Sequence, residues 1–422
     1  MNAVAIIGAT FHGNRGAEAM LSATISALEE RCPNNLQFNI FSYYPSADQR
    51  LISDSRVKIY SAKPAYLVSI LLPGSLFYKL FEWLHLGFLR RYLPTSVRAL
   101  AESKVLLCLA GVSFVDGRIK FLPFNVATLW PALILGVPVV KLAQAMGPFE
   151  NWLNRLLARL VLSRCFCIFA RGERTFSYLQ TLQGLSLRVQ RADDTAFLFC
   201  PEDCISQAYP GLESRLQRLS DSQKAGHLII GLCPSSVIEK HWRRAGKNYV
   251  AWFQSLIHAL VTKGYVIALY PNATRGEDMK KLHNNDLPII NTVFLNLEAD
   301  IRNSVVAFEG SWNVAQIHNI VAACDIHVVS RFHAMIAALN ASVPVLVIGW
   351  SHKYAEVMDG FGQADMVLDN RMCDLQLVMK NIDRLSSERY ARSSCIAKAL
   401  TKKKESARHQ FDHLLVSLDN CL

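Results

Sequence analysis

The sequence from residue 324 to residue 358 reads CDIHVVSRFHAMIAALNASVPVLVIGWSHKYAEVM, and this stretch decides the fold class. It contains two short apolar runs, 326–329 and 343–348, and each is followed by polar residues and then by a segment with helical spacing. Uninterrupted apolar runs of this length are typical of strands that are buried on both faces of a parallel sheet. The stretch therefore predicts a strand–turn–helix unit that occurs twice in succession.

Polar side chains stand where both predicted strands end: Ser330, Arg331 and His333 after the first, and Ser351, His352 and Lys353 after the second. In open α/β sheets, ligands bind at the carboxyl ends of the strands, where helix N-termini direct amide donors outward. Because several of these side chains are cationic, we expect an anionic ligand at this edge of the sheet.

The composition is that of a globular protein rather than a disordered one. The chain has 422 residues, of which 51% are hydrophobic and 19% charged, and its net charge is +11. Such a length suits two or three domains of about 150 residues each. The positive charge could serve nucleic acid, an anionic membrane or anionic substrates. Since the densest basic run, 402–404, falls in a helical pattern without interleaved aromatic residues, we expect no nucleic-acid partner.

The cysteines indicate neither a metal site nor an oxidising compartment. Eleven cysteines are scattered without a CxxC pair, and Cys200 and Cys204, which come nearest to zinc-ligand spacing, have no second pair to complete a site. We expect no metal and no cofactor. The N-terminal residues read as a first strand rather than a signal peptide. These features predict a cytoplasmic protein.

Strand-then-helix units recur along the chain, which predicts parallel, doubly wound sheets. We expect an N-terminal Rossmann-like domain over 1–200, a linker over 201–226 that is rich in Ser, Gln, Asp and Gly, and a second Rossmann-like domain over 227–385. Residues 386–422 are expected to form a helical segment. Two such domains in series predict a ligand-binding cleft between them.

The stretch 65–92 is strongly apolar, but Pro73 and Gly74 interrupt it. No run in it reaches the roughly 18–20 uninterrupted apolar residues that a transmembrane helix needs. Residues 76–92 instead predict an amphipathic helix with a cationic end at Arg90 and Arg91. Two interpretations are open: the helix packs on the core of its domain, or it attaches the protein peripherally to the inner face of an anionic membrane.

Polar loop motifs occur along the chain in a fixed order: GNRGAE from Gly13 to Glu18, GVSFVD from Gly111 to Asp116, MGPF at 146–149, ARGER at 170–174, ADDTAF at 192–197, SRFH from Ser330 to His333, and then Lys353. This order resembles the polysaccharide pyruvyl transferase family over residues 4–365, and in particular the branch that acts in colanic-acid-like exopolysaccharide assembly. Two departures concern the acceptor side: a Gly-Gly-Gly run is replaced by Ala110-Gly111-Val112, and the acidic residue after Gly16 is displaced to Glu18.

The resemblance implies a fold similar to glycosyltransferase B and transfer of the pyruvyl group of phosphoenolpyruvate onto two hydroxyls of a sugar, as a cyclic ketal. It implies that Arg331 binds the anionic groups of the donor, that His333 is the general acid, and that Lys353 is a further essential cation. The N-terminal domain would then carry the acceptor and the C-terminal domain the donor. The expected substrate-binding residues are Arg171, Ser330, Gly13, Asn14, Gly16, Glu18, Asp116 and Asp193.

The chemistry of the reaction agrees with these residue types. Phosphoenolpyruvate carries a carboxylate and a phosphate, which need two or more cations, and a histidine has a pKa suited to proton transfer. The base that deprotonates the sugar could be Asp193, Asp194 or Glu18. The acceptor would be a lipid-linked or nucleotide-linked oligosaccharide. Two other functions remain open: a nucleotide-sugar-dependent glycosyltransferase of the same architecture, and a non-catalytic scaffold at the membrane.

Overall fold

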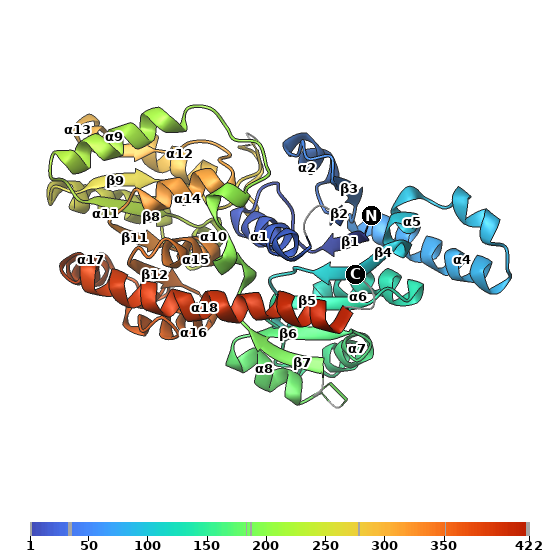
Figure 1. Ribbon diagram of the computed structural model, residues 1–422. Helices are drawn as coiled ribbons and strands as arrows, with labels where there is room; N and C mark the ends of the chain where they lie inside the picture. Colours follow the sequence, from blue (N-terminus) through green and yellow to red (C-terminus); the bar gives the residue numbers. More distant parts are fainter. Residues whose placement is uncertain are drawn as a thin grey trace. The chain divides into compact units, whose positions relative to one another are not determined.

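The computed structural model describes residues 2–32, 36–182, 184–185, 188–276, 279–350 and 352–418. The chain forms two compact units, each of which is built on its own parallel sheet (Figure 1). Unit 1 comprises Met1–Phe11, Ala17–Leu198 and Lys404–Leu422, and unit 2 comprises His12–Gly16 and Phe199–Lys403. The predicted α/β class with two Rossmann-like domains is confirmed.

Unit 1 has a seven-stranded sheet in the order β3-β2-β1-β4-β5-β6-β7, with all neighbours parallel. The strands are β1 (Asn2–Ile7), β2 (Leu36–Ser42), β3 (Val57–Ser61), β4 (Ser103–Cys108), β5 (Val139–Gln144), β6 (Cys167–Arg171) and β7 (Val189–Ala192). The strand order reverses between β1 and β4, which is the place where doubly wound folds bind ligands.

The helices of unit 1 are α1 (Arg15–Arg31), α2 (Pro45–Leu51), α3 (Pro64–Tyr66), the π-helical turn η1 (Leu67–Leu71), α4 (Leu72–Trp83), α5 (Thr95–Ala101), α6 (Leu122–Leu135), α7 (Trp152–Leu162) and α8 (Glu173–Gln180), with 3₁₀ turns η2 (Gly87–Tyr92), η3 (Asp116–Phe121) and η5 (Thr195–Leu198). Most of these helices flank the sheet, whereas α4 packs on α5 and α6 and extends away from the sheet (Figure 1). The central strands are buried on both faces, as their continuous apolar runs predict.

Unit 2 has a six-stranded parallel sheet in the order β10-β9-β8-β11-β12-β13. Its strands are β8 (Ile229–Cys233), β9 (Val266–Leu269), β10 (Val305–Ala307), β11 (Ile326–Val329), β12 (Val345–Gly349) and β13 (Val367–Asp369). The stretch that decides the fold forms β11, α15 (Phe332–Asn340), β12 and α16 (His352–Asp359), as predicted. Since β11 lies between β8 and β12, its carboxyl end is at the middle of the sheet edge.

The other helices of unit 2 are η6 (Pro201–Asp203), α9 (Leu212–Lys224), α10 (Ser236–Arg244), α11 (Tyr249–Thr262), α12 (Leu287–Leu295), α13 (Ala299–Asn303), α14 (Val314–Ala322), η7 (Ala364–Met366) and α17 (Leu375–Ser387). Residues 201–226, which the composition indicated as a linker, contain η6 and α9. Helix α9 packs against β8, β9 and β10 because Leu212 and Leu219 bury one face of an otherwise polar segment. It is therefore a layer of unit 2.

Helix α18 (Arg389–Leu418) contributes to both units, since residues up to Lys403 belong to unit 2 and those from Lys404 onward to unit 1. Within unit 1, the Gln410 side chain is buried and bonds β5 and the residue that follows β7. It accepts a hydrogen bond from the amide of Ala143 at 2.7 Å and donates one to the carbonyl of Asp193 at 2.9 Å. The end of the chain thus helps to hold the sheet of unit 1.

Candidate functional site

The glycine-rich loop at 13–16 belongs to unit 2, where it pairs with the segment that follows β9. The amide of Thr274 donates to the carbonyl of Gly13 at 2.7 Å, and the amide of Arg15 donates to the carbonyl of Asn272 at 3.2 Å. The Asn14 side chain accepts from the amide of Gly16 at 3.1 Å, which closes the turn. The loop is therefore fixed on unit 2 by backbone pairing.

At two positions in this loop, a side chain would force the surrounding structure to move. Gly13 has a φ of +84°, and a Cβ there would overlap the guanidinium of Arg275. A Cβ on Gly16 would overlap the imidazole ring of His333. The absence of a side chain at Gly16 is what lets the ring of His333 lie directly against the loop.

His333 is the second residue of α15, and its ring is half-buried. The ring meets that of Phe332 edge to face, with centroids 5.2 Å apart. Gly16 borders the ring on another side. The structure thus brings together three of the predicted site residues, His333, Gly16 and Asn14, at the carboxyl edge of the sheet of unit 2.

Arg331 lies at the same edge, but its guanidinium is bound by the protein. Its Nε donates to both carboxylate oxygens of Asp286 at 3.0 and 3.1 Å, and its Nη2 donates to Asp286 and to the hydroxyl of Ser236. Its Nη1 donates to the side-chain oxygen of Asn284 at 2.6 Å. Because a guanidinium has five N–H groups, these bonds leave at most one of them for a ligand.

Asp286 is buried at the meeting point of three loops. Besides Arg331, it accepts hydrogen bonds from the amides of Ser236 and Ala273, both at 3.0 Å. Burial alone would lower the pKa of Arg331, but the carboxylate of Asp286 outweighs it and raises that pKa above its usual range. Arg331 is therefore held in its charged form, and Asp286 compensates that charge. Its geometry fixes the ends of β8, β9 and β11 relative to one another.

Lys353, in the first turn of α16, lies over aromatic rings. Its ammonium is 4.6 Å from the ring centre of Phe332, 5.1 Å from that of Trp350 and 5.5 Å from that of Tyr354. Contacts of this kind stabilise a cation without neutralising its charge. Lys353 therefore presents a positive charge at the end of β12, beside the end of β11.

Ser330 is almost completely buried below this cluster. Its amide donates to the carbonyl of Cys233 at 3.1 Å, and its carbonyl accepts from the hydroxyl of Tyr354 at 3.3 Å. Its position suits a residue that holds the strand end rather than one that touches a ligand. Ser351 and the side chain of His352 lie outside the described residues.

The remaining predicted site residues belong to unit 1. Arg171, at the end of β6, forms a buried ion pair with Asp194, with Nη1 and Oδ2 at 2.6 Å. Glu18, on α1, is fully buried. The amide and the carbonyl of Asp193 are both bound by α18, through Ser406 at 3.1 Å and Gln410 at 2.9 Å.

Asp116 organises a neighbouring loop of unit 1. It accepts from the amide of Glu150 at 2.6 Å and from the side-chain amide of Asn154 at 2.7 Å. These bonds tie the GVSFVD motif to the residues after the MGPF motif, and the amide of Gly147 donates to the carbonyl of Phe114 at 3.2 Å, which joins the two motifs directly. Asp116 therefore holds two loops together, and substrate contact by Asp116 stays a prediction.

Asp286 is the residue that sequence reasoning missed. It follows no strand and precedes Leu287-Pro288, so the sequence around it reads only as a turn before a helix. Its partner Asn284 was missed for the same reason, whereas Ser236 stands at the end of a predicted strand, after β8, and was overlooked because it carries no charge. A hint was available, because a buried arginine at the end of a strand requires an acidic partner somewhere in the fold.

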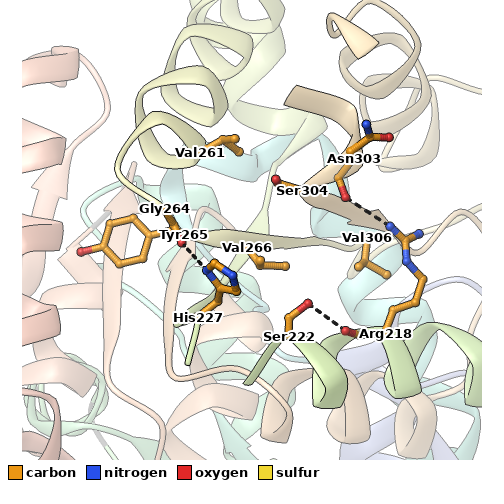
Figure 2. A pocket seen from close by; sticks show the side chains of 10 residues that line it. All are labelled: Arg218, Ser222, His227, Val261, Gly264, Tyr265, Val266, Asn303, Ser304 and Val306. Carbon is orange, nitrogen blue, oxygen red and sulfur yellow. Dashed lines mark hydrogen bonds between the residues drawn. The ribbon is translucent and has the colours of Figure 1, made fainter. Parts of the chain in front are cut away.

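A separate cavity of about 250 Å³ lies at the opposite, amino edge of the same sheet (Figure 2). Its polar side chains are turned to nearby groups of the protein: Arg218 donates to the carbonyl of Asn303 at 3.4 Å, and the ring of His227 bonds the carbonyl of Gly264 at 3.1 Å. Since none of the predicted site residues lines it, we do not count this cavity as part of the candidate site.

Across the described ranges, no three His, Cys, Asp or Glu side chains are grouped so as to hold a metal ion.

Comparison with solved structures confirms the fold. UDP-GlcNAc 2-epimerase from Neisseria meningitidis, bound to UDP-GlcNAc, matches with a TM-score of 0.59 and 12% identity over 99% of this chain and 100% of that one. The S. aureus MnaA-UDP structure has a TM-score of 0.60 and 12% identity, over 99% of this chain and 97% of that one. Anabaena HepE in complex with UDP and glucose has a TM-score of 0.53 and 12% identity, over 99% of this chain and 100% of that one. At such low identity the likeness concerns the fold alone, which is of the glycosyltransferase-B type.

Sequence comparison adds the family. The amylovoran biosynthesis protein AmsJ of Erwinia amylovora is 22% identical over 383 residues, which cover 87% of this chain and 88% of AmsJ. The family model for polysaccharide pyruvyl transferase matches residues 14–352, a span that begins in the glycine-rich loop and includes Arg331 and His333. This protein belongs to the polysaccharide pyruvyl transferase family.

Proposed function

We propose that this protein transfers the pyruvyl group of phosphoenolpyruvate onto two hydroxyls of a sugar in an exopolysaccharide precursor, forming a cyclic ketal. Membership of the family makes it a transferase of polysaccharide biosynthesis. The similarity to AmsJ, a protein named for amylovoran biosynthesis, supports an exopolysaccharide as the product. Phosphoenolpyruvate as the donor and a cyclic ketal as the product are the parts of the proposal that go beyond the family and the relative.

The observation that carries the proposal is the position of His333 against Gly16, with Lys353 at the end of the next strand. A half-buried imidazole and an ammonium thus stand at one edge of the sheet of unit 2, where parallel sheets bind ligands. This pair of groups suits a substrate that is anionic and that accepts a proton. Phosphoenolpyruvate has both properties, since its carboxylate and phosphate are anionic and its C3 is a nucleophilic carbon that accepts a proton. Its phosphate is also a leaving group.

The overall reaction balances without a further reactant. Protonation of C3 converts the methylene group to a methyl group and leaves C2 electrophilic. One sugar hydroxyl attacks C2 and loses its proton, the bond from C2 to the phosphate oxygen breaks, and the second hydroxyl then attacks C2 and loses its proton. Of the two hydroxyl protons, one returns to the acid that protonated C3, and the other leaves with inorganic phosphate.

His333 would donate the proton to C3, because an imidazole exchanges protons near neutral pH and its ring is held in place by Gly16 and Phe332. Lys353 would bind the phosphate and stabilise it as it leaves. We assign Arg331 mainly to positioning, because Asp286 compensates its charge and takes up several of its donors. At most one N–H of Arg331 would reach the donor.

The test is phosphate release from phosphoenolpyruvate in the presence of membrane extract from the source cells, together with thermal shift in phosphoenolpyruvate, inorganic phosphate or UDP-glucose. We expect phosphoenolpyruvate to raise the melting temperature and His333→Ala to lower the rate of release by at least about 10²-fold while the variant keeps its fold. Stabilisation by UDP-glucose alone, with no phosphate release, would instead indicate a nucleotide-sugar glycosyltransferase.

A further inference from the structure

The helical segment from α3 to η2, residues 64–92, exposes large apolar side chains to solvent. The most exposed is Trp83, at 76%, followed by Tyr92 at 70% and Phe88 at 61%. The other exposed members are Val68, Ile70, Leu76, Phe77, Leu80 and Leu84. Single exposed apolar residues are ordinary on a protein surface, but a continuous group of this size marks an interaction site.

On α4 the usual arrangement of an amphipathic helix is reversed. Residues 76, 77, 80, 83 and 84 follow the 3–4-residue spacing of one helical face, and this face is exposed. The fully buried positions of the helix are small residues, Gly74 and Ser75, and Tyr78 packs against the core beside them. A Cβ on Gly74 would come within 2.6 Å of Cγ2 of Val97 on α5, so close packing accounts for the glycine there. The large apolar face of α4 is therefore not used in the folding of unit 1.

Cations accompany this face. Residues 64–92 contain Lys79, Arg90 and Arg91 and only one carboxylate, Glu82, which pairs with Lys79 at 2.7 Å and with Arg90 at 3.2 Å. The guanidinium of Arg91 lies over the ring of Tyr92 at 4.8 Å, and both residues are exposed. Aromatic and arginine side chains together at the end of an apolar face match the interfacial region of an anionic bilayer, where phosphates meet acyl chains.

The same segment is long and apolar enough to cross a membrane by length and composition, over Pro64–Trp83 with a mean hydropathy of 1.3. Its packing opposes that orientation. Helix α4 is packed against α5 and α6 of unit 1 along its inner face, so lipid cannot surround it while the unit stays folded. A helix with one face on protein and the other face apolar can lie in the plane of a membrane surface.

A second helix of unit 1 repeats the pattern. On α7, Trp152, Leu156 and Leu160 form an exposed stripe at four-residue spacing, and the exposed Arg155 and Arg159 stand next to it. Helix α6 packs against both α4 and α7. Unit 1 thus carries two exposed apolar faces with arginine at their borders, which favours an extended anionic apolar partner over a small ligand.

We propose that the exposed face of α4 and η2 binds the surface of an anionic phospholipid bilayer. The side chains of Leu76, Leu80 and Trp83 enter the acyl boundary, and Arg91 binds lipid phosphates. This inference does not depend on the reaction: it concerns a surface of unit 1, whereas the donor residues lie in unit 2. An enzyme held in this way meets a lipid-linked sugar at the membrane face rather than in solution.

The experiment is co-sedimentation of the full chain with vesicles of equal parts phosphatidylglycerol and phosphatidylcholine, and with pure phosphatidylcholine vesicles. The test variant is Leu76→Glu/Trp83→Glu, and the matched control is Leu282→Glu/Leu295→Glu, which changes two exposed leucines of unit 2. We expect the wild type and the control to bind phosphatidylglycerol vesicles, and the test variant to bind at least about tenfold more weakly. Arg91→Glu should weaken binding to anionic vesicles more than to neutral ones.

Melting temperatures of all variants verify that the fold survives, which is expected because the substituted side chains are exposed. Equal binding by the wild type and by Leu76→Glu/Trp83→Glu would overturn the proposal, as would no binding of the wild type to anionic vesicles. Gel filtration tests whether a second copy of the chain occupies this face instead. A wild-type dimer that becomes a monomer in the test variant, without vesicle binding by the wild type, would identify such a dimer and overturn the membrane proposal.

Discussion

The α-carbon of Gly16 lies directly against the imidazole ring of His333, so that any side chain at Gly16 would overlap the ring. These residues are more than three hundred positions apart in the sequence, and both belong to unit 2. The contact connects two of the family motifs, the glycine-rich loop and the SRFH segment. It explains why the loop needs a glycine at this position, and it makes the loop a wall of the proposed proton-transfer site.

Gly16→Ala should therefore impair catalysis more than stability. The added methyl group must displace either the loop or the His333 ring, and a displacement of about 1 Å in a catalytic group can lower kcat by about 10²-fold. The measurement is steady-state phosphate release at saturating phosphoenolpyruvate. Gly117→Ala is the control, because a Cβ at Gly117 would meet no atom within 4 Å.

A double-mutant cycle with His333→Ala sharpens this prediction. If Gly16→Ala acts by moving the histidine ring, it should have little further effect on the residual rate of the His333→Ala variant. Fully additive losses would mean that the loop acts independently of His333.

Asp286→Asn should destabilise unit 2 strongly. Removing the charge of Asp286 leaves the buried guanidinium of Arg331 without compensation, and loss of one partner of a buried pair typically costs about 3–5 kcal/mol. The free energy of unfolding from urea titration measures the effect. The exposed pair Lys263–Asp383, with an N–O distance of 2.7 Å, provides the control; Asp383→Asn should cost about 0–1 kcal/mol.

Arg331→Met combined with Asp286→Asn should be more stable than Asp286→Asn alone, because the uncompensated charge is then removed as well. A cost for Asp286→Asn no larger than that of the Asp383 control would contradict the role of this pair in fixing the strand ends.

Lys353→Met should raise the KM for phosphoenolpyruvate by about tenfold or more, since it removes a cation from an otherwise intact aromatic surface. Lys353→Arg keeps the charge but changes its geometry, so its KM should lie between that of the wild type and that of Lys353→Met. Lys247, whose ammonium lies 5.4 Å from the ring centre of Trp242, is a lysine of the same unit in a similar contact. Lys247→Met should leave the KM unchanged. Equal KM values for the two methionine variants would remove Lys353 from the donor site.

His327 predicts an acid sensitivity of unit 2. Its buried ring donates from Nε2 to the carbonyl of Val321 at 3.0 Å, and its Nδ1 lies 3.1 Å from the hydroxyl of Tyr270, from which the neutral ring accepts a hydrogen bond. Burial lowers the pKa of His327 from 6.5 to about 4. The unfolded chain therefore binds one more proton than the folded chain between these values, and folding stability falls as the pH drops from 6.5 to 4.

The shift corresponds to about 3 kcal/mol of unfolding free energy. His327→Gln should flatten the pH dependence of stability in this window, measured by urea titration at a series of pH values. The control is His227→Gln, a change at an exposed histidine, and its profile should run parallel to that of the wild type. A His327→Gln profile that also runs parallel would show that His327 does not titrate in this way.

Much of the fold could be predicted from the sequence because its strands are continuous apolar runs. The stretch at 324–358 predicted β11, α15, β12 and α16. The ligand site that its polar residues indicate at the strand ends stays a prediction. The segment 201–226 was harder, because its polar composition hides the two leucines, Leu212 and Leu219, that hold α9 on the sheet. Local composition does not reveal such sparse contacts.

The candidate site was predictable only in part, because sequence patterns identify charges but not their partners. Arg331 was expected to bind the donor, whereas the structure pairs it with Asp286, a residue from a turn that follows no strand. Likewise, the loop at 13–16 follows the first strand of unit 1 but pairs with unit 2, and only the three-dimensional structure places Gly16 against His333.

The most direct test of the proposed reaction is transfer of radioactive carbon from phosphoenolpyruvate labelled in its carboxyl group. The label is followed into lipid-extractable glycan, in membrane extract from source cells that lack this gene, supplemented with wild-type protein or with His333→Ala. The account predicts that the wild type incorporates the label with release of one phosphate per pyruvyl group, and that His333→Ala incorporates it at least about 10²-fold more slowly. Absence of label in the glycan with wild-type protein, while label from a UDP-sugar is incorporated, would contradict it.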